Sequence, residues 1–302
     1  MNNANPSPKM SPLHIWWLAI RPRTLPAALS AVIVACALTL YDGVFRFGPA
    51  LAALLVALLL QIGCNLANDV FDFERGADTE ERQGPLRVTQ AGLISPAGMR
   101  RAMFAVFAAA ALLWLYMSWA SSWLMLAVGV LAILAAVAYT GGPWPFGYHG
   151  LGDPMAFLFF GPVAVAGAYF VQAGRISAAA WWMSVPVGLI IMAILVVNNL
   201  RDIETDRVAG KRTLAVRFGA AAARREYLWC LIVAYALVPC LVAAGLLPWQ
   251  TLLSWGSLAV ARRTWRTVRD HTGPILNEAL AGTGKIVLAY SVLFALGLWW
   301  AA

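Results

Sequence analysis

Long apolar runs separated by short polar connections make up most of this chain. A helix of about 17 to 25 apolar residues can cross the hydrocarbon core of a bilayer. After a polar, disordered tail at residues 1–12, the pattern predicts one all-α transmembrane domain, residues 13–302, that begins with a short interfacial helix. Its nine predicted spans, the eighth of them short, are 25–41, 48–71, 99–118, 122–139, 154–171, 178–200, 226–244, 248–260 and 280–300.

The composition supports an integral membrane protein. Hydrophobic residues make up 61% of the chain and charged residues 12%, whereas about a quarter of residues are charged in soluble domains. With nine spans, all of the 22 Lys and Arg residues except Arg46 and Arg175 lie on one side, which should be the cytoplasm. We therefore expect a multi-pass protein of the bacterial inner membrane with a cytoplasmic N-terminus and a periplasmic C-terminus. Basic loops beside an anionic leaflet explain the net charge of +8, so no nucleic-acid partner is expected.

A polar stripe interrupts the apolar pattern at the end of the second span. Asn65, Asn68, Asp69 and Asp72 follow an i, i+3, i+4, i+7 spacing, so all four share one face of a helix. Ionisable groups on a buried face are costly unless they are paired or bind a metal. This stripe is therefore a candidate site.

A second acidic motif ends the sixth span with Asn199, Asp202 and Asp206 at i, i+3 and i+7. Each motif, 65–78 and 198–206, continues into a basic turn that contains Gly, which indicates an internal repeat. Carboxylates that hold Mg²⁺, next to basic groups for phosphate oxygens, suit a metal-bound diphosphate. Charges at span ends are often only solvated, but the inward spacing and the repetition favour a functional site that faces the cytoplasm.

The loop at 139–153 is rich in Gly, Pro and aromatic residues and contains no Lys or Arg. This composition marks an irregular loop that suits a cover for a hydrophobic substrate, with a plain interfacial turn as the alternative. His149 alone carries no argument, and His14 and His271 lack partners at ligand spacing, so we interpret both as structural. We expect the cysteines to be buried small hydrophobic residues: Cys36, Cys64, Cys230 and Cys240.

Short strings along nearly the whole chain add a resemblance. They are Arg21–Pro26, Asn65–Asp78 with its sequel Glu80–Pro85, Arg87–Gln90, Tyr139–Pro143, Gly147–Gly152, Asn198–Leu214 and Leu276-Asn277. In this combination and order they resemble the UbiA superfamily of intramembrane prenyltransferases, and within it the branch that uses 1,4-dihydroxy-2-naphthoate in menaquinone biosynthesis.

The resemblance implies a nine-helix bundle, dependence on Mg²⁺, and transfer of a long isoprenyl group from a polyprenyl diphosphate to 1,4-dihydroxy-2-naphthoate with loss of CO₂. The Mg²⁺ ligands would be Asp69, Asp72, Asp202 and Asp206. The residues that complete the metal shell or orient these carboxylates would be Asn65, Asn68 and Asn199. The diphosphate contacts would be Arg82, Arg87, Lys211 and Arg212, with Arg207 as a further candidate. The residues that help to deprotonate the acceptor would be Asp78 and Asp153.

One position departs from the family pattern. Other branches carry a Lys four residues after a Tyr at the end of the fourth span; if Tyr139 is that Tyr, Pro143 occupies the position of the Lys. The missing positive charge must then come from elsewhere, and Lys211 is the candidate. Tyr139 is kept as a substrate-binding candidate whose role is open.

Two other kinds of function are open from the sequence. Secondary transporters also combine internal repeats with charges inside the membrane, but nearly every acid here lies at one membrane face rather than in the middle of a span. A sister enzyme would use a phytyl donor, or an acceptor such as 4-hydroxybenzoate, homogentisate or haem. The strings after the first acidic motif and around Tyr139 favour naphthoate.

Overall fold

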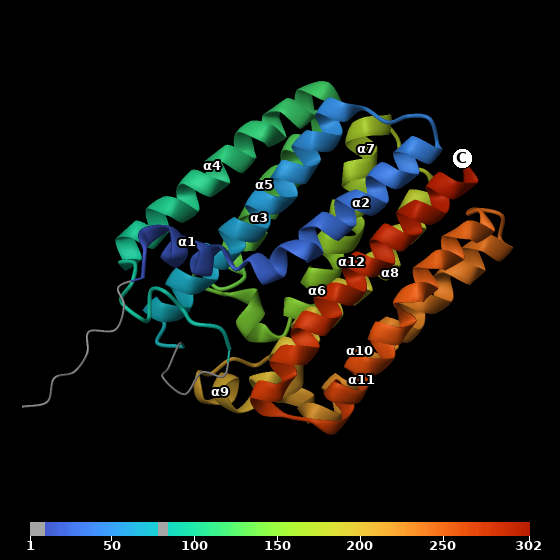
Figure 1. Cartoon of the computed structure of the whole chain (residues 1–302). Helices are drawn as coiled ribbons and strands as arrows, with labels where there is room; N and C mark the ends of the chain where they lie inside the picture. Colours follow the sequence, from blue (N-terminus) through green and yellow to red (C-terminus); the bar gives the residue numbers. More distant parts are fainter. Residues whose placement is uncertain (1–9, 78–83) are drawn as a thin grey trace, which may run out of the picture.

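The computed structural model describes residues 10–77 and 84–302, so most of the predicted tail lies outside the described residues. The described chain is helical and contains no strands, which confirms the all-α prediction. The long helices run roughly alongside one another as a bundle (Figure 1). In chain order the elements are α1 (Pro12–Ile20), η1 (Pro22–Thr24), α2 (Leu25–Tyr41), α3 (Phe47–Glu74), α4 (Pro96–Ala120), α5 (Leu124–Ala138), η2 (Phe146–His149), α6 (Gly152–Leu158), η3 (Phe159–Ala166), α7 (Gly167–Ala173), α8 (Ala178–Arg201), α9 (Ile203–Val208), α10 (Leu214–Ala243), η4 (Trp249–Ser257), α11 (Leu258–Asp270), η5 (Gly273–Ile275) and α12 (Leu276–Ala301).

Helices cover all nine predicted spans within the described chain. Seven stretches are long and apolar enough to cross a membrane: Pro12–Tyr41, Phe47–Glu74, Pro96–Ala120, Gly152–Ala173, Ala178–Arg201, Leu214–Ala243 and Gly273–Ala301. The fourth predicted span is the shorter helix α5, and the eighth is η4 continued by α11. The assignment of residues 13–302 to one domain with an internal repeat stays a prediction.

The predicted end of the eighth span at residue 260 was wrong, because the helix continues to Asp270. The second half of α11 is amphipathic rather than apolar. Arg262, Arg263 and Arg266 are exposed, whereas Thr264 and Val268 on the other face are buried. An apolar window detects only the first half of such a helix.

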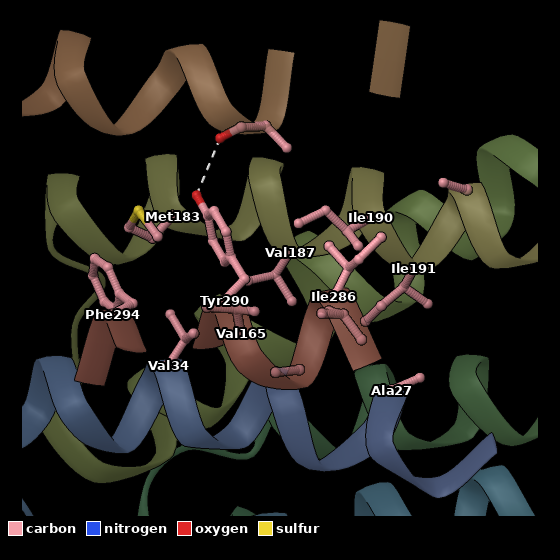
Figure 2. Packing of buried hydrophobic residues seen from close by; sticks show 14 of the residues in the cluster. Ala27, Val34, Val165, Met183, Val187, Ile190, Ile191, Ile286, Tyr290 and Phe294 are labelled. Carbon is pink, nitrogen blue, oxygen red and sulfur yellow. Dashed lines mark hydrogen bonds between the residues drawn. The ribbon is translucent and has the colours of Figure 1, made fainter. Parts of the chain in front are cut away.

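Helix α8 lies in the centre of the hydrophobic core and contacts α2, α10, α12 and η3. Figure 2 shows labelled residues of this core from α2, η3, α8 and α12: Ala27, Val34, Val165, Met183, Val187, Ile190, Ile191, Ile286, Tyr290 and Phe294. The Tyr290 hydroxyl donates to the Ala234 carbonyl of α10 at 3.1 Å, so this buried polar group is paired. These contacts fix the helix whose end carries the second acidic motif.

A pair of glycines lets η3 approach α8 closely. A side-chain Cβ at Gly161 would lie 2.6 Å from the Ser184 carbonyl oxygen, and one at Gly188 would lie 2.9 Å from the Gly161 Cα. Small residues permit such close backbone contact between membrane helices, where packing rather than the hydrophobic effect holds helices together. The η3 stretch is π-helical and contains Pro162, which removes a backbone donor.

The cysteines are free thiols, but the prediction that all four are buried was wrong for Cys240, which is exposed on α10. Cys230 is buried, and Cys36 and Cys64 are partly buried. Cys240 faces outward because an apolar residue gains nothing from facing the bundle rather than lipid tails.

Gly161→Ala should lower the thermal unfolding midpoint of the detergent-solubilised protein, because the new Cβ meets backbone that cannot move away easily. Overpacking of this kind costs about 1–3 kcal/mol. Gly167→Ala is the matched control, since the nearest atom there is a flexible Met125 methyl at 3.9 Å. Equal midpoints for the two variants, measured by size-exclusion recovery after heating, would contradict the packing argument.

Candidate active site

Helix α3 ends at Glu74, two residues after the polar stripe of Asn65, Asn68, Asp69 and Asp72. Gly76 adopts a φ of 66°, and the Ala77 amide donates to the Asp72 carbonyl at 2.9 Å, which closes the last turn. Asn68 is partly buried and the other three motif residues are buried. The predicted shared face therefore turns into the bundle.

Asp69 binds the segment that follows the first motif. The Thr89 and Val88 amides donate to its two carboxylate oxygens at 3.0 and 3.3 Å. The Arg21 guanidinium lies 3.7 Å from the same carboxylate, which is 1% exposed. Backbone amides and a guanidinium together satisfy a buried charge that would otherwise be costly.

Asp72 is the point where three segments meet. Its carboxylate accepts from Arg87 at 2.8 Å and from the Tyr148 hydroxyl at 2.7 Å. The Lys211 ammonium lies 3.3 Å from Asp72 and 4.0 Å from Asp206. Lys211 therefore connects the first acidic motif to the second.

The second motif is organised around Arg201, the last residue of α8. Its guanidinium donates to Asp202 through two nitrogens, one of them at 2.7 Å. It also donates to Asn277 at 2.7 Å and to Asn198 at 2.8 Å. These bonds tie the end of α8 to the start of α12. Figure 1 shows α9, which follows this end of α8, far from the C-terminus.

Basic side chains neutralise the buried carboxylates of both motifs: Arg21 for Asp69, Arg87 and Lys211 for Asp72, and Arg201 for Asp202. In the described part of the chain, no three His, Cys, Asp or Glu side chains lie close enough to hold a metal by themselves. The Lys211 ammonium nevertheless marks a place where a positive charge fits between Asp72 and Asp206. Carboxylate oxygens are the donors that Mg²⁺ prefers, and this ion commonly takes further ligands from substrate phosphates. The donor set therefore fits a magnesium ion bound together with a diphosphate.

Comparison with known proteins shows the family to which this chain belongs. The UbiA prenyltransferase family matches residues 28–277. The chain belongs to this family. The predicted membrane prenyltransferase architecture is confirmed, and a secondary transporter is no longer a competing interpretation.

Curated UbiA relatives match almost from end to end. A protein named 1,4-dihydroxy-2-naphthoate octaprenyltransferase from Escherichia coli is 38% identical and covers 97% of this chain and 99% of its own. One of the same name from Mycobacterium tuberculosis is 38% identical and covers 93% and 96%. A 2-carboxy-1,4-naphthoquinone phytyltransferase from Synechocystis is 30% identical and covers 88% and 86%.

Solved UbiA structures share the fold. A UbiA homologue from Aeropyrum pernix superposes with a TM-score of 0.68 at 16% identity and covers 97% of this chain and 99% of its own. A UbiA homologue from Archaeoglobus fulgidus, described as bound to DMAPP and Mg²⁺, superposes with a TM-score of 0.64 at 15% identity and covers 94% and 98%.

The three candidate asparagines, Asn65, Asn68 and Asn199, contact neighbouring segments. Asn65 donates to the Ile20 carbonyl and the Thr24 hydroxyl, both at 2.9 Å. Asn68 accepts from Thr140 at 2.9 Å. Asn199 donates to both oxygens of Asp153 at 3.1 and 3.3 Å, and both residues are buried.

The remaining predicted residues that the structure describes have contacts of their own. Arg212 is exposed, and its backbone amide donates to the Tyr148 carbonyl at 2.8 Å. Arg207 is exposed and pairs with Glu204 at 2.8 Å. Tyr139 follows α5, and its ring meets Phe146 edge-on with centroids 5.5 Å apart. Two further candidates, Arg82 and Asp78, lie outside the described residues.

Sequence reasoning gave no role to three residues that the structure places at the site: Arg21, Tyr148 and Arg201. Arg21 is the one non-glycine with positive φ in the described chain, at 55°, a conformation held at some cost and often found at functional sites. The signals were present in the sequence, since all three lie inside or beside the strings that carry the family resemblance. A short sequence match does not show which of its side chains point toward the site.

Proposed function

We propose that this chain transfers a long polyprenyl group from its diphosphate to a ring carbon of 1,4-dihydroxy-2-naphthoate, with loss of the carboxylate as CO₂. The product is the demethylmenaquinol of menaquinone biosynthesis. The observation that carries the proposal is the end-to-end similarity to the Escherichia coli and Mycobacterium tuberculosis proteins named for this acceptor and an octaprenyl donor.

A phytyl donor is the second candidate. The Synechocystis relative is named as a phytyltransferase, but at 30% identity it is less similar than the octaprenyltransferases at 38%. We therefore infer a polyprenyl donor, as named for the more similar relatives, rather than a phytyl donor. The other sister acceptors, 4-hydroxybenzoate, homogentisate and haem, find no support in the names of these relatives.

The cofactor would be Mg²⁺, held by Asp69, Asp72, Asp202 and Asp206. When bound, it would supply the positive charge that stabilises the leaving diphosphate. The Archaeoglobus fulgidus homologue described with DMAPP and Mg²⁺ supports this cofactor. The Thr89 amide and the Tyr148 hydroxyl hold the carboxylates of Asp69 and Asp72 in one orientation.

The residues that bind the diphosphate oxygens are Arg87, Lys211, Arg212 and Arg82. Arg87 is 4% exposed and is already bonded to Asp72, so its geometry is set before the substrate arrives. Lys211 has a flexible stem and moves more easily. A preorganised cation next to a mobile one suits a leaving group whose charge grows during the reaction.

The prenyl cation must meet the acceptor ring before it meets water. The apolar helices below the site exclude water and accommodate the prenyl tail. Asp153 is 2% exposed and its carboxylate accepts from Asn199, which supports Asp153 as the group that takes a proton from the acceptor hydroxyl. Loss of that proton enriches the ring in electrons.

The protein is a multi-pass inner-membrane protein. We place the site at the cytoplasmic face, with a cytoplasmic N-terminus and a periplasmic C-terminus. The uneven distribution of Lys and Arg supports this orientation, because the basic turns at Arg87 and Lys211 lie at the acidic site while Arg46 and Arg175 belong to loops on the other side.

Membranes that contain the protein should convert a polyprenyl diphosphate and 1,4-dihydroxy-2-naphthoate to a prenylated naphthoquinol, detected by mass, when Mg²⁺ is present. Asp69→Asn or Asp202→Asn should reduce the rate at least about 100-fold, since they remove metal ligands rather than residues that only support them. Glu204→Gln is the matched control, because Glu204 is exposed and pairs only with the exposed Arg207 among the described residues. Full activity in EDTA, or in either Asp variant, would contradict the metal role.

Lys211→Ala should raise the KM for the polyprenyl diphosphate more than the KM for the naphthoate, because the lost contact is with phosphate oxygens. The kcat should fall as well, since negative charge grows on the departing diphosphate. Lys211→Arg should retain part of the activity because its charge is preserved. Lys285→Ala, which removes an exposed Lys of α12, is the control. If Lys211→Ala has the KM and kcat of the parent enzyme, Lys211 does not bind the diphosphate, and the positive charge of this turn only sets the orientation of the protein in the membrane.

A reporter fused after Ala302 should report the periplasm, and one inserted within residues 201–225 should report the cytoplasm. The location is measured with paired fusions: alkaline phosphatase is active in the periplasm, and green fluorescent protein fluoresces in the cytoplasm. A cytoplasmic C-terminus would mean an even number of spans.

A further inference from the structure

Tyr148 contacts the first acidic motif and the basic turn that follows the second. It lies in η2, between α5 and α6. Its hydroxyl donates to Asp72 of the first motif at 2.7 Å. Its ring lies under the Lys211 ammonium, 4.8 Å from the centroid, and its carbonyl accepts from the Arg212 amide at 2.8 Å.

The η2 loop is bonded to the turn that follows the second motif. Arg217 donates to the His149 carbonyl at 2.8 Å and to the Arg212 carbonyl at 3.0 Å, so its guanidinium joins the two segments. Gly150 adopts a φ of 79°, and a Cβ there would lie 3.0 Å from the Arg212 carbonyl oxygen. The backbone that carries Tyr148 is therefore held against residues 212–217 before any substrate binds.

The Lys211 ammonium has neighbours of two kinds. It lies between the carboxylates of Asp72 and Asp206, at 3.3 and 4.0 Å, and over the face of the Tyr148 ring. A lysine has a long flexible stem, so carboxylates on two sides do not by themselves fix its position. The aromatic face adds an attraction that favours one position of the ammonium.

We propose that Tyr148 is a positioning residue that sets Asp72 and Lys211 relative to each other. Its hydroxyl orients the carboxylate that binds the metal, and its ring holds the ammonium that binds the diphosphate. The inference rests on the proposed function, and it divides the role of one side chain into two parts that can be removed separately.

The two parts predict different defects. Tyr148→Phe removes the hydroxyl and keeps the ring, so about tenfold more Mg²⁺ should be needed, with the KM for the polyprenyl diphosphate unchanged at saturating Mg²⁺. Tyr148→Leu removes both parts, so the diphosphate requirement should also rise, by about fivefold. Neither variant should change the KM for the naphthoate.

The test does not depend on turnover alone. The thermal midpoint of the purified protein is measured as Mg²⁺ is titrated at fixed inorganic diphosphate, and then as diphosphate is titrated at fixed Mg²⁺, since ligands that bind the folded state raise the midpoint. KM and kcat for both substrates are measured on the same preparations. Tyr116→Phe, which removes the hydroxyl of a half-exposed tyrosine on α4, should match the parent in every measurement.

A double variant separates positioning from a general structural role. In the Lys211→Ala background, Tyr148→Leu should raise the diphosphate requirement no further than Tyr148→Phe does, because the ammonium that the ring held is gone. Additive defects would mean that Tyr148 acts only through loop stability, and the inference would be overturned. If Tyr148→Leu does not fold, Tyr148→Trp keeps a π face without the hydroxyl and should behave like Tyr148→Phe; a diphosphate defect in Tyr148→Trp would count against the ring role.

The outcomes keep this inference distinct from the proposed function. Parent-like titrations for Tyr148→Phe and Tyr148→Leu, in an enzyme that prenylates the naphthoate, would overturn the positioning role and leave the function intact. Absence of prenylated naphthoquinol with the parent protein would overturn the function, while a tenfold shift in the Mg²⁺ titration of Tyr148→Phe would still support the orientation of Asp72.

Discussion

A buried carboxylate needs positively charged or hydrogen-bonding partners, and this requirement shapes the whole polar end of the bundle. Asp72 is 2% exposed, and its partners Arg87, Tyr148 and Lys211 come from three different segments. Removing a partner from a buried ion pair typically costs about 3–5 kcal/mol, so each of these three segments stabilises the end of α3. The contacts that stabilise this end of the fold are therefore also the contacts that shape the site.

The two motifs are held with different rigidity. Arg201 is planar and is bonded to Asp202, Asn198 and Asn277, so its guanidinium has little freedom to turn. Lys211 has a flexible stem and is held by two carboxylates and one ring face. A bound metal ion would supply the positive charge that Lys211 now supplies beside Asp72 and Asp206. Arg201 therefore leaves Asp202 little freedom to move, whereas Lys211 can move more easily.

The sequence predicted the features that depend on helical periodicity. The apolar runs located the helices of the bundle, seven stretches of which are long and apolar enough to cross a membrane. The spacing of Asn65, Asn68, Asp69 and Asp72 predicted a common inward face because the helical repeat dictates it. Partners from distant segments could not be predicted in this way. The spacing that placed Asn199 beside Asp202 could not show that its amide turns to Asp153. Tyr148 looked like one aromatic residue among several, since the contacts that distinguish it join positions 72, 148 and 211.

Charged side chains hold the site together, and the apolar part of the bundle is held in another way. Lipid tails are as apolar as the side chains of α8, so burial against a neighbouring helix gains little by itself in a bilayer. Close contact at Gly161 and Gly188, and isolated bonds such as that of Tyr290 to Ala234, hold the helices there. An apolar prenyl chain needs no polar partner among these helices, whereas a buried carboxylate without a partner is costly at the polar end. The difference between the polar end and the apolar helices matches the substrate. Its charged diphosphate needs fixed partners, and its tail needs only an apolar space that excludes water.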